Sequence, residues 1–426
     1  MTDTDAVLEA APSLRLTVRQ QEQLDGVRGD AAAMAMRVIV GIARVKGATA
    51  LRDITGVHID SCLFHGRSGL DFVRGLAEAG GRVCVPTTTN VGSVNLRHPE
   101  LPRREPQVET DGTEFMRLYG RLGVEQTWTC APYQLPGRPV RGEHVAWAES
   151  NAIVFANSVL GARTDRYGDF LDVCAAITGC APDAGLHRDE ARLATCRIDV
   201  SGIPVTGEWV YPLLGYLVGQ IAGTGVPVVT GLRDRRSEGP TEDDLQAFGA
   251  AAASSGGVAL FHLEGVTPEC AQVEDVCDPV GVPVTVLGPQ DLERAQAELT
   301  TAERGERIDA VCLGTPHASL GRLREIARLL QVHSGDLRVP LWVNTGRFTA
   351  DALAADYPID HAVLERAGVR IVTDTCTYLL PRLHDDWRVI LTDSAKWAHY
   401  GPGNVGVRVA FASLEQCVHA AREGWL

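Results

Sequence analysis

The sequence lacks the features that would place the protein in a membrane, outside the cell or on nucleic acid. No apolar run is long enough to cross a bilayer. Residues 1–11 are acidic and polar, whereas a signal peptide needs a basic start followed by an apolar stretch. No basic run is present, and 54 acidic against 40 basic residues give a net charge of -14, so the surface repels phosphate backbones. We therefore expect a cytoplasmic protein that binds neither nucleic acid nor membranes.

The sequence also lacks the cysteine patterns of zinc sites and redox motifs. Its 11 cysteines include no CxxC pair and no zinc-finger spacing. An odd number of scattered cysteines, in a chain expected in the reducing cytosol, indicates mostly free thiols. A single cysteine is most often a small buried apolar residue, so only its position within a motif can point to a role.

The length and the order of apolar runs predict a multi-lobe α/β protein. A chain of 426 residues exceeds the size at which one hydrophobic core usually stops growing. Helical spacing of apolar residues over 12–46 predicts a helical N-terminal arm, residues 1–45. Beyond it, short β-branched apolar runs end in polar residues and are often followed by helical stretches, which is typical of buried, largely parallel strands. We expect a catalytic lobe over residues 46–206 and one or more further α/β lobes over residues 207–426.

Polar residues gather just past the predicted strands, where parallel α/β sheets bind ligands. A hydroxyl at one such position is most often a turn residue or a helix cap. Several together predict the rim of one polar pocket. The segments are residues 87–93, 315–317, 344–347, 375–376 and 394–396.

Three cysteines stand out by position. Cys312 and Cys376 lie at the ends of predicted strands, and Cys130 lies in a loop-like segment. Three thiolates from distant segments could bind iron and leave one coordination position open, which a Lewis-acid dehydration needs for the departing hydroxyl. Spacing alone is a weak argument, because three of 11 cysteines can be chosen in many ways.

Two further segments carry polar groups in unusual density. His58 and Asp60 share one face if residues 56–66 are extended. We interpret them as substrate-binding, with local hydrogen bonding or metal binding as alternatives. Glu149 and Ser150 lie in an apolar helical stretch, where buried polar side chains normally contact a ligand or a polar network.

Several cations are candidates for an anionic substrate group. Arg163 and Arg166 follow the same helical stretch and suit a carboxylate or a phosphate, with ordinary surface ion pairs as the alternative. Lys396 follows the last predicted strand. It could hold a carboxylate, or act as a base if its pKa is lowered, although most lysines are solvated surface charges.

These motifs, in this order, resemble the aconitase X family. The matching segments are residues 58–66, 85–96, 127–135, 147–164, 311–317, 374–376 and 396–403, so that the resemblance spans roughly 46–423. The resemblance implies an aconitase-like, multi-lobe α/β/α fold with largely parallel sheets. It also implies a hydro-lyase that removes water from a small hydroxy acid.

The resemblance further implies roles for individual residues. An iron-sulfur cluster, or iron, would be bound by Cys130, Cys312 and Cys376, and replacing Cys312 by alanine should abolish iron binding and turnover. The predicted catalytic residues are Lys396, Glu149 and Ser150. The predicted substrate-binding residues are His58, Asp60, Asn90, Ser93, Arg163 and His317.

Two activities are known in the family, the dehydration of cis-3-hydroxy-L-proline and that of mevalonate 5-phosphate. Residues 58–66 and 90–96 look more like the hydroxyproline type. The phosphate-bearing alternative would need extra cations, for which Arg163, Arg166 and Arg347 are candidates. Family enzymes also need a small swivelling domain that carries a serine thought to be the catalytic base. The sequence offers no segment for it, so we expect a separate small subunit.

Two other hypotheses remain at this stage. A non-catalytic binding or regulatory protein could have kept the fold, although the presence of all three cysteines disfavours this. A metal-free enzyme could use Lys396 as its base. Iron analysis of anaerobically purified protein would separate that hypothesis from the iron-dependent one.

Overall fold

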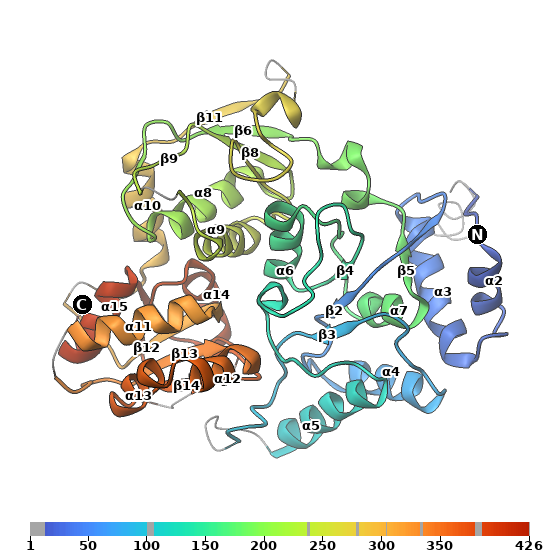
Figure 1. Cartoon of the computed structure of the whole chain (residues 1–426), viewed down its shortest axis with the longest axis horizontal. Coiled ribbons are helices and arrows are strands. Elements are labelled where there is room, and N and C mark those ends of the chain that lie inside the picture. The colour runs from blue at the N-terminus through green and yellow to red at the C-terminus, as the bar shows by residue number, and fades with distance from the viewer. Residues whose placement is uncertain are drawn as a thin grey trace.

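Three open sheets follow one another along the chain in the computed structural model (Figure 1). The structure describes residues 13–99, 106–236, 239–277, 281–303, 305–332, 335–379 and 386–425. Every strand pair within these three sheets is parallel. The predicted α/β fold with parallel sheets is therefore confirmed. We call the parts built around the three sheets the first, middle and third lobes.

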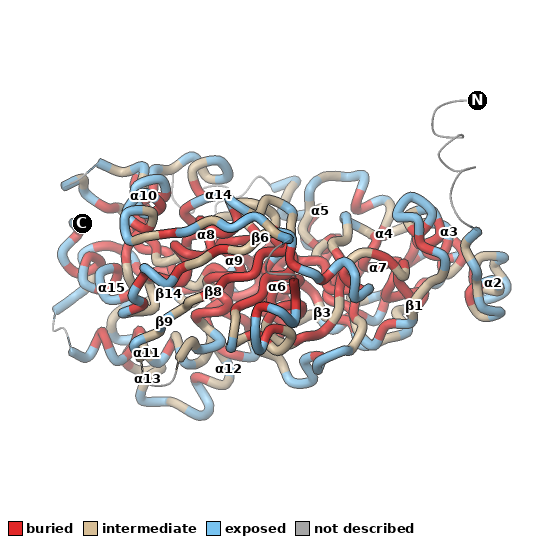
Figure 2. Tube along the Cα trace, turned by 90° about the horizontal axis from the view of Figure 1, so that it is seen from above, coloured by how far each residue is buried: buried red, intermediate tan, exposed pale blue. Residues whose placement is uncertain are grey.

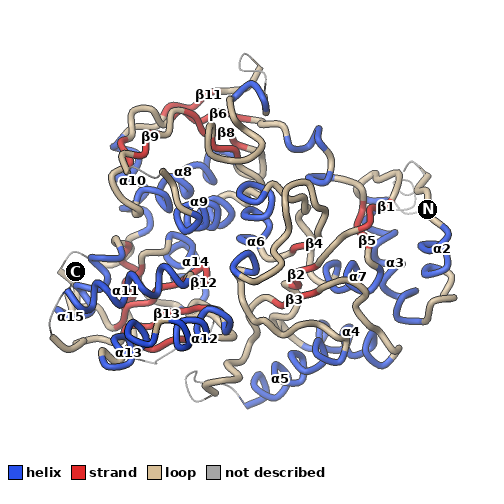
Figure 3. Tube along the Cα trace, viewed as in Figure 1, coloured by secondary structure: helices blue, strands red, loops and turns tan. Residues whose placement is uncertain are grey.

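The first lobe holds a small sheet of order β3-β2-β4 and an antiparallel pair, β1 and β5. Its strands are β1 (Leu51–Asp53), β2 (Val57–Ile59), β3 (Thr87–Thr89), β4 (Ala146–Trp147) and β5 (Cys180–Pro182). Its helices are α2 (Val18–Leu24), α3 (Asp30–Val45), α4 (Arg67–Glu78), α5 (Pro106–Arg121), α6 (Ser150–Phe155) and α7 (Leu171–Thr178). Long loops surround these short strands (Figure 3), and they carry much of the site described below.

The middle lobe is a four-stranded sheet of order β10-β8-β6-β11 with a small accessory pair, β7 and β9. Its strands are β6 (Cys196–Asp199), β7 (Pro204–Val205), β8 (Pro227–Thr230), β9 (Arg233–Asp234), β10 (His262–Leu263) and β11 (Val284–Val286). Its helices are α8 (Val210–Ala222), α9 (Glu242–Ser255) and α10 (Pro289–Leu299). The predicted division at residue 206 stays a prediction; β6 and β8, which pair with each other, lie on opposite sides of it.

The third lobe is a five-stranded sheet of order β14-β13-β12-β15-β16. Its strands are β12 (Ala310–Ala318), β13 (Leu341–Thr345), β14 (Arg370–Val372), β15 (Val389–Thr392) and β16 (Arg408–Phe411). Its helices are α11 (Leu320–Val332), α12 (Arg347–Asp356), α13 (Pro358–Arg366), α14 (Ala395–Val405) and α15 (Leu414–Glu423).

The N-terminal helical stretch differs from its prediction. Two helices, α2 and α3, replace the single stretch expected over 12–46, because Gly26 and Gly29 adopt positive φ angles of 81° and 100° between them. The apolar face of α3 buries Met36 and Ile39 in the core of the first lobe, where α3 packs against α7. α3 is therefore an integral part of that lobe.

Helix α9 connects the three lobes. It packs against α8 of the middle lobe, α6 of the first and α14 of the third. Buried residues run continuously through α6, α8 and α9 (Figure 2). The first turns of α6 and α14 are thereby fixed near each other, although they are more than 200 residues apart in sequence. Within the described residues, no helix is both long and apolar enough to span a membrane.

Candidate active site

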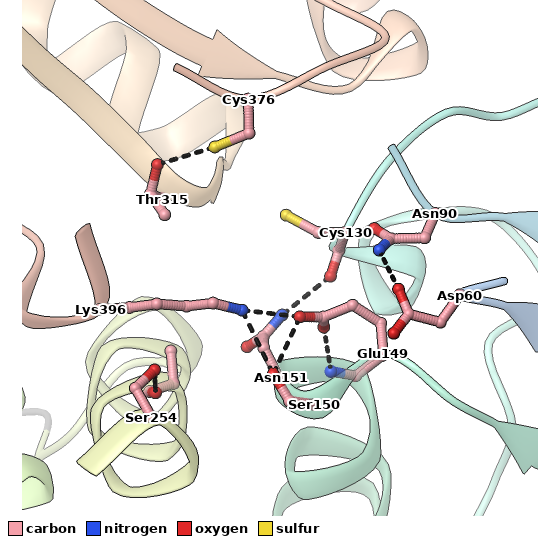
Figure 4. Close-up of polar contacts among 12 residues, drawn as sticks. Asp60, Asn90, Cys130, Glu149, Ser150, Asn151, Ser254, Thr315, Cys376 and Lys396 are labelled. Carbon is pink, nitrogen blue, oxygen red and sulfur yellow. Dashed lines mark hydrogen bonds and ion pairs between the residues drawn. The ribbon is translucent and has the colours of Figure 1, made fainter. Parts of the chain in front are cut away.

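A buried ion pair joins the first and third lobes. Lys396, in the first turn of α14, places Nζ 2.6 Å from Oε1 of Glu149, the residue that caps the N-terminus of α6 (Figure 4). Ser150 Oγ lies 3.3 Å from the same nitrogen. The two charged side chains are only 3% and 6% exposed, so each depends on the other for compensation of its lost hydration.

The pair remains ionised. Burial alone would raise the pKa of Glu149, but the Lys396 charge and hydrogen bonds from backbone amides outweigh it and hold that pKa below its ordinary value. Burial would lower the pKa of Lys396, but Glu149 raises it well above the ordinary value. Lys396 is thus a fixed cation, and the hypothesis that it acts as a base through a lowered pKa is not supported by its surroundings.

Two of the predicted cysteine ligands lie beside this pair. Cys130 Sγ accepts a hydrogen bond from the amide of His317 at 3.2 Å, and Cys376 Sγ lies 3.1 Å from Thr315 Oγ1 (Figure 4). Burial raises the pKa of both thiols, that of Cys376 to about 11, while the charge of Lys396 opposes the rise. Both sulfurs are therefore neutral thiols here, and binding of a cation would be needed to deprotonate them.

The third predicted ligand, Cys312, lies on β12, where its thiol interacts with the side chain of Thr377 and with Cys376, the residue before Thr377. Along β12, Ala310 and Cys312 face the core shared with the middle lobe, whereas Val311 and Leu313 face the core of the third lobe. Cys312 is fully buried there, and burial raises its pKa to about 12. Among the described residues, no three His, Cys, Asp or Glu side chains come close enough together to hold a metal ion. The strand's alternation, rather than its end, thus decides where Cys312 points.

Thr315 takes the place beside Cys376 because the chain turns sharply just before it. Gly314 has a φ of 78°, and a Cβ atom there would lie 2.2 Å from the carbonyl oxygen of Asn344 on β13. The β12–β13 register also shifts between Leu313 and Ala318. Because of this turn, the side chain of Thr315 does not follow the in-and-out alternation of β12, and its hydroxyl points to the Cys376 thiol.

The first lobe contributes a carboxyl group and an amide on neighbouring strand ends. Asp60 follows β2 and Asn90 follows β3, which pair in parallel, and Asn90 Nδ2 donates to Asp60 Oδ1 at 2.5 Å (Figure 4). Burial, and then the nearby Glu149 charge, raise the pKa of Asp60 to about 7, against a lowering by Asn90. Asp60 can therefore exchange a proton near neutral pH.

Asp172, at the start of α7, was not predicted from the sequence. Its carboxylate accepts from the amides of Asp60 (2.7 Å) and Ser61 (3.0 Å) and from Ser61 Oγ (2.7 Å), and so it fixes the loop that carries Asp60. The available signal was a lone aspartate in the otherwise apolar segment 171–177. Asn151 has a similar role, since its Nδ2 donates to the carbonyl oxygen of Cys130 at 2.8 Å.

Two predicted histidines are buried and neutral. Burial lowers the pKa of His58 to about 3, and its Nδ1 lies 2.8 Å from Thr88 Oγ1. Burial likewise lowers the pKa of His317 to about 4. The His317 ring lies 3.0 Å from Thr129 Oγ1 and 3.2 Å from the carbonyl oxygen of Thr375, residues adjacent to Cys130 and Cys376. His317 thus positions both cysteine segments.

Other predicted residues have structural partners away from the ion pair. Ser93 Oγ accepts from the amide of Phe64 at 2.7 Å and holds the loop after β2. Arg163 pairs with Asp189 at 2.5 Å and donates to the carbonyl oxygen of His187. Arg347 pairs with the buried Asp374. Substrate binding by Ser93 and Arg163 stays a prediction that these contacts do not favour.

Comparison with known proteins bears on the family and the fold. Models of the first, second and third domains of aconitase X match residues 13–190, 194–297 and 308–423. The solved holo-form of aconitase X from Thermococcus kodakaraensis superposes with a TM-score of 0.84 at 32% identity, covering 96% of this chain and all of that one.

Two groups of curated relatives also match. A cis-3-hydroxy-L-proline dehydratase of Hypocrea jecorina is 42% identical over 97% of this chain and 69% of its own length, and one of Pseudomonas aeruginosa is 41% identical over 96% and 70%. The phosphomevalonate dehydratase large subunit of Methanothermobacter thermautotrophicus is 36% identical over 92% of this chain and 95% of its own length.

The fold and the relatives together define a hydro-lyase of aconitase-like architecture. The chain belongs to the aconitase X family. The resemblance and the enzyme class predicted from the sequence are confirmed, and the non-catalytic hypothesis is set aside.

Proposed function

We propose that the chain is the large subunit of a dehydratase that acts on cis-3-hydroxy-L-proline. The observation that carries the proposal is the buried Glu149–Lys396 pair, in which Lys396 is a fixed cation. The Glu149 charge also acts on Asp60, and together with burial it raises the pKa of Asp60 to about 7. The choice of substrate is supported by identities of 42% and 41% to two dehydratases named for it, against 36% to 30% for the phosphomevalonate dehydratase large subunits.

The side chains of the site suit an elimination of water. The reaction removes the proton α to the carboxylate, leaves negative charge on the substrate and breaks the bond to the departing hydroxyl. Lys396 keeps its charge and can stabilise the developing negative charge in a site from which water is largely excluded. Ser150, within 3.3 Å of Lys396 and 3.1 Å of Glu149, orients the ammonium group.

Cys130 and Cys376 fit an iron centre, because both thiols lie in this site and the charge of Lys396 favours their deprotonated forms. When bound, such a centre would supply a Lewis acid for the departing hydroxyl. That the centre is an iron-sulfur cluster, and that Cys312 is its third ligand, stay predictions.

A separate small subunit is the partner that we propose. The phosphomevalonate relatives are named large subunits and match this chain over almost their whole length, 94% to 98%. The two hydroxyproline relatives are longer, and this chain spans 69% and 70% of them. We propose that a serine of the small subunit acts as the base that removes the α-proton of the substrate. The cytoplasmic location stays a prediction.

Mevalonate 5-phosphate is the alternative substrate. A phosphate would need several cations near the site. Of the three candidate arginines, Arg163 and Arg347 are paired with Asp189 and Asp374. Only Arg166 is left for a phosphate, which favours a substrate with a single carboxylate.

The test is an activity assay of the anaerobically reconstituted protein with its candidate small subunit, on cis-3-hydroxy-L-proline and mevalonate 5-phosphate in parallel. We expect turnover of the first substrate. Turnover of mevalonate 5-phosphate alone would contradict the proposed substrate while leaving the dehydratase chemistry in place. Turnover of neither, with iron bound, would contradict both substrates.

A further inference from the structure

A cavity opens next to the Glu149–Lys396 pair, between the first lobe and the C-terminal end of α9. Its volume is about 210 Å³. Asp60 and Ser150 form part of its wall, so it adjoins the candidate active site on the side of the first lobe, while Glu149 and Lys396 do not line it. Ile153, Ala253, Val258 and Ala259 give it an apolar side. The cavity therefore offers polar groups at one end and a hydrocarbon surface along its length.

Arg166 is the cation of this cavity. In the described part of the chain, its guanidinium donates to one carbonyl oxygen, that of Thr224 at 3.4 Å, and pairs with no carboxylate. Burial lowers the pKa of Arg166 below its ordinary value, against an opposing effect of the Asp165 carboxylate, which itself pairs with Lys46. A half-buried guanidinium with most of its five N–H donors unused is poised to bind an anion.

Arg163 and Arg166 differ in their partners, and of the two only Arg163 pairs with a carboxylate. Arg163 lies only three residues earlier and is fully engaged by Asp189 and by the carbonyl oxygen of His187. Gly257, which also lines the cavity, has a φ of 93°, and a Cβ atom there would be in van der Waals contact with Arg166 Nη1, at 3.7 Å. Because residue 257 is glycine, it places no side chain against this part of the Arg166 guanidinium.

We propose that Arg166 binds the carboxylate of the substrate and that Asp60 binds its imino nitrogen, so that the cavity is a recognition site for a small cyclic amino acid. The inference rests on the proposed function for the identity of the reacting molecule. The carboxylate pairs with the guanidinium, the positively charged nitrogen pairs with the Asp60 carboxylate, and the ring lies against Ile153 and Val258.

The same arrangement discriminates against phosphorylated hydroxy acids. Such a molecule has no cation for Asp60, and a phosphate brought into the cavity would meet the Asp60 carboxyl group with only one arginine to offset it. Asp60 and Arg166 are therefore the residues that we expect to determine specificity.

Calorimetry with L-proline tests the assignment without turnover, because L-proline has the carboxylate and the imino nitrogen but no hydroxyl group to lose. The holoenzyme should bind L-proline and should not bind L-prolinamide. Arg166→Gln should weaken L-proline binding about ten- to a hundredfold, the usual range for a charge-assisted hydrogen bond. Arg188→Gln, which removes an exposed arginine that pairs with Glu190, is the matched control and should bind like the wild type. Wild-type affinity in Arg166→Gln, or equal binding of L-prolinamide, would overturn the role of Arg166.

Asp60 has its own comparison, between L-proline and tetrahydrofuran-2-carboxylate, in which oxygen replaces the imino group. The wild type should prefer L-proline, and Asp60→Asn should lose that preference; an unchanged preference would overturn the role of Asp60.

Failure of this binding assignment can be distinguished from failure of the proposed function. Turnover of cis-3-hydroxy-L-proline with an unchanged KM in Arg166→Gln would support the proposed function and contradict the assignment of Arg166 to the substrate carboxylate. Turnover of mevalonate 5-phosphate alone would sink the proposed substrate first.

Discussion

The two walls of the candidate active site differ in what they contribute. The first lobe supplies the acidic and amide groups, Asp60, Asn90 and Glu149, each held by hydrogen bonds. The third lobe supplies the fixed cation Lys396, together with Cys376 and Thr315. Acid–base groups and the cation thus come from different parts of the chain.

This division shows why neither lobe carries the chemistry alone. Lys396 keeps its charge in a buried position because Glu149 faces it. The Cys130 segment is positioned by His317, which lies across the boundary in the third lobe. Positioning across the boundary means that a change on one wall should alter the properties of groups on the other.

The largest expected effect separates the two cysteines of the third lobe. Cys376→Ser should lose the bound iron and essentially all turnover, because its thiol lies in the site. Cys312→Ala tests the third predicted ligand: it should also lose iron and turnover if Cys312 binds iron, whereas retained iron with a loss of about 1–2 kcal/mol of stability would mean that its side chain only fills the core. Iron content of anaerobically purified protein and chemical unfolding measure the two effects. Iron retained in Cys376→Ser would contradict the placement of Cys376 as an iron ligand.

Asp60 should set the pH dependence of the reaction. Its pKa is raised to about 7, so that it is mostly protonated below that pH and ionised above it. If the ionised form binds substrate, kcat/KM should fall as the pH drops below about 7. Asp60→Asn should lack this fall in kcat/KM at low pH and have a kcat/KM reduced about ten- to a hundredfold, the usual range for a lost charge-assisted contact. The same fall of kcat/KM below about pH 7 in Asp60→Asn would mean that another group, and not Asp60, causes the pH dependence.

Gly314 tests how the wall formed by the third lobe is shaped. Gly314→Ala should cost about 1–3 kcal/mol, because both the positive φ and the contact with Asn344 oppose a side chain. Gly137→Ala is the control, with a φ of 77° and nothing within 4 Å of the added Cβ. Thermal unfolding should show a clearly larger loss for Gly314→Ala. Equal losses would mean that backbone conformation alone, and not the approach to β13, requires glycine at position 314.

The last expected effect is on the pH dependence of the free energy of unfolding. Since the folded state raises the pKa of Asp60, this carboxyl group favours the fold at low pH, and its contribution is lost as the pH rises from about 4 through about 7. The stability of Asp60→Asn relative to the wild type should therefore rise between pH 5 and pH 8, by about 2–3 kcal/mol. Unfolding curves at the two pH values measure the change, and a relative loss over that range would reverse the sign of the argument.

Much of the fold and part of the site followed from local sequence patterns. Buried apolar runs with polar ends predicted parallel strands, and the residues after them, including Asn90, Cys376 and Lys396, do meet at one site. Within each lobe this follows because the carboxyl ends of parallel strands share one edge of a sheet. The approach of the first and third sheets to each other follows from the packing of α6 and α14 on α9, which no local pattern shows.

The remaining features depend on contacts distant in sequence. The pKa of Lys396 depends on Glu149, 247 residues away. Arg163 and Arg166 are equivalent in sequence, and only the position of Asp189 decides which of them stays unpaired. The side to which Cys312 points was not available from the sequence either, because residues 310–313 are all apolar and β12 is buried on both faces.

The most direct test of a site shared between two lobes is turnover of cis-3-hydroxy-L-proline, with the small subunit present, by Lys396→Met, Glu149→Gln and the double variant. Arg236→Gln, which breaks a half-buried ion pair in the middle lobe, is the control for general damage. If Glu149 and Lys396 act as one unit, each single variant should lose nearly as much turnover as the double variant, and the control should keep its kcat. Wild-type kcat in either single variant, with the fold intact by circular dichroism, would contradict the shared site.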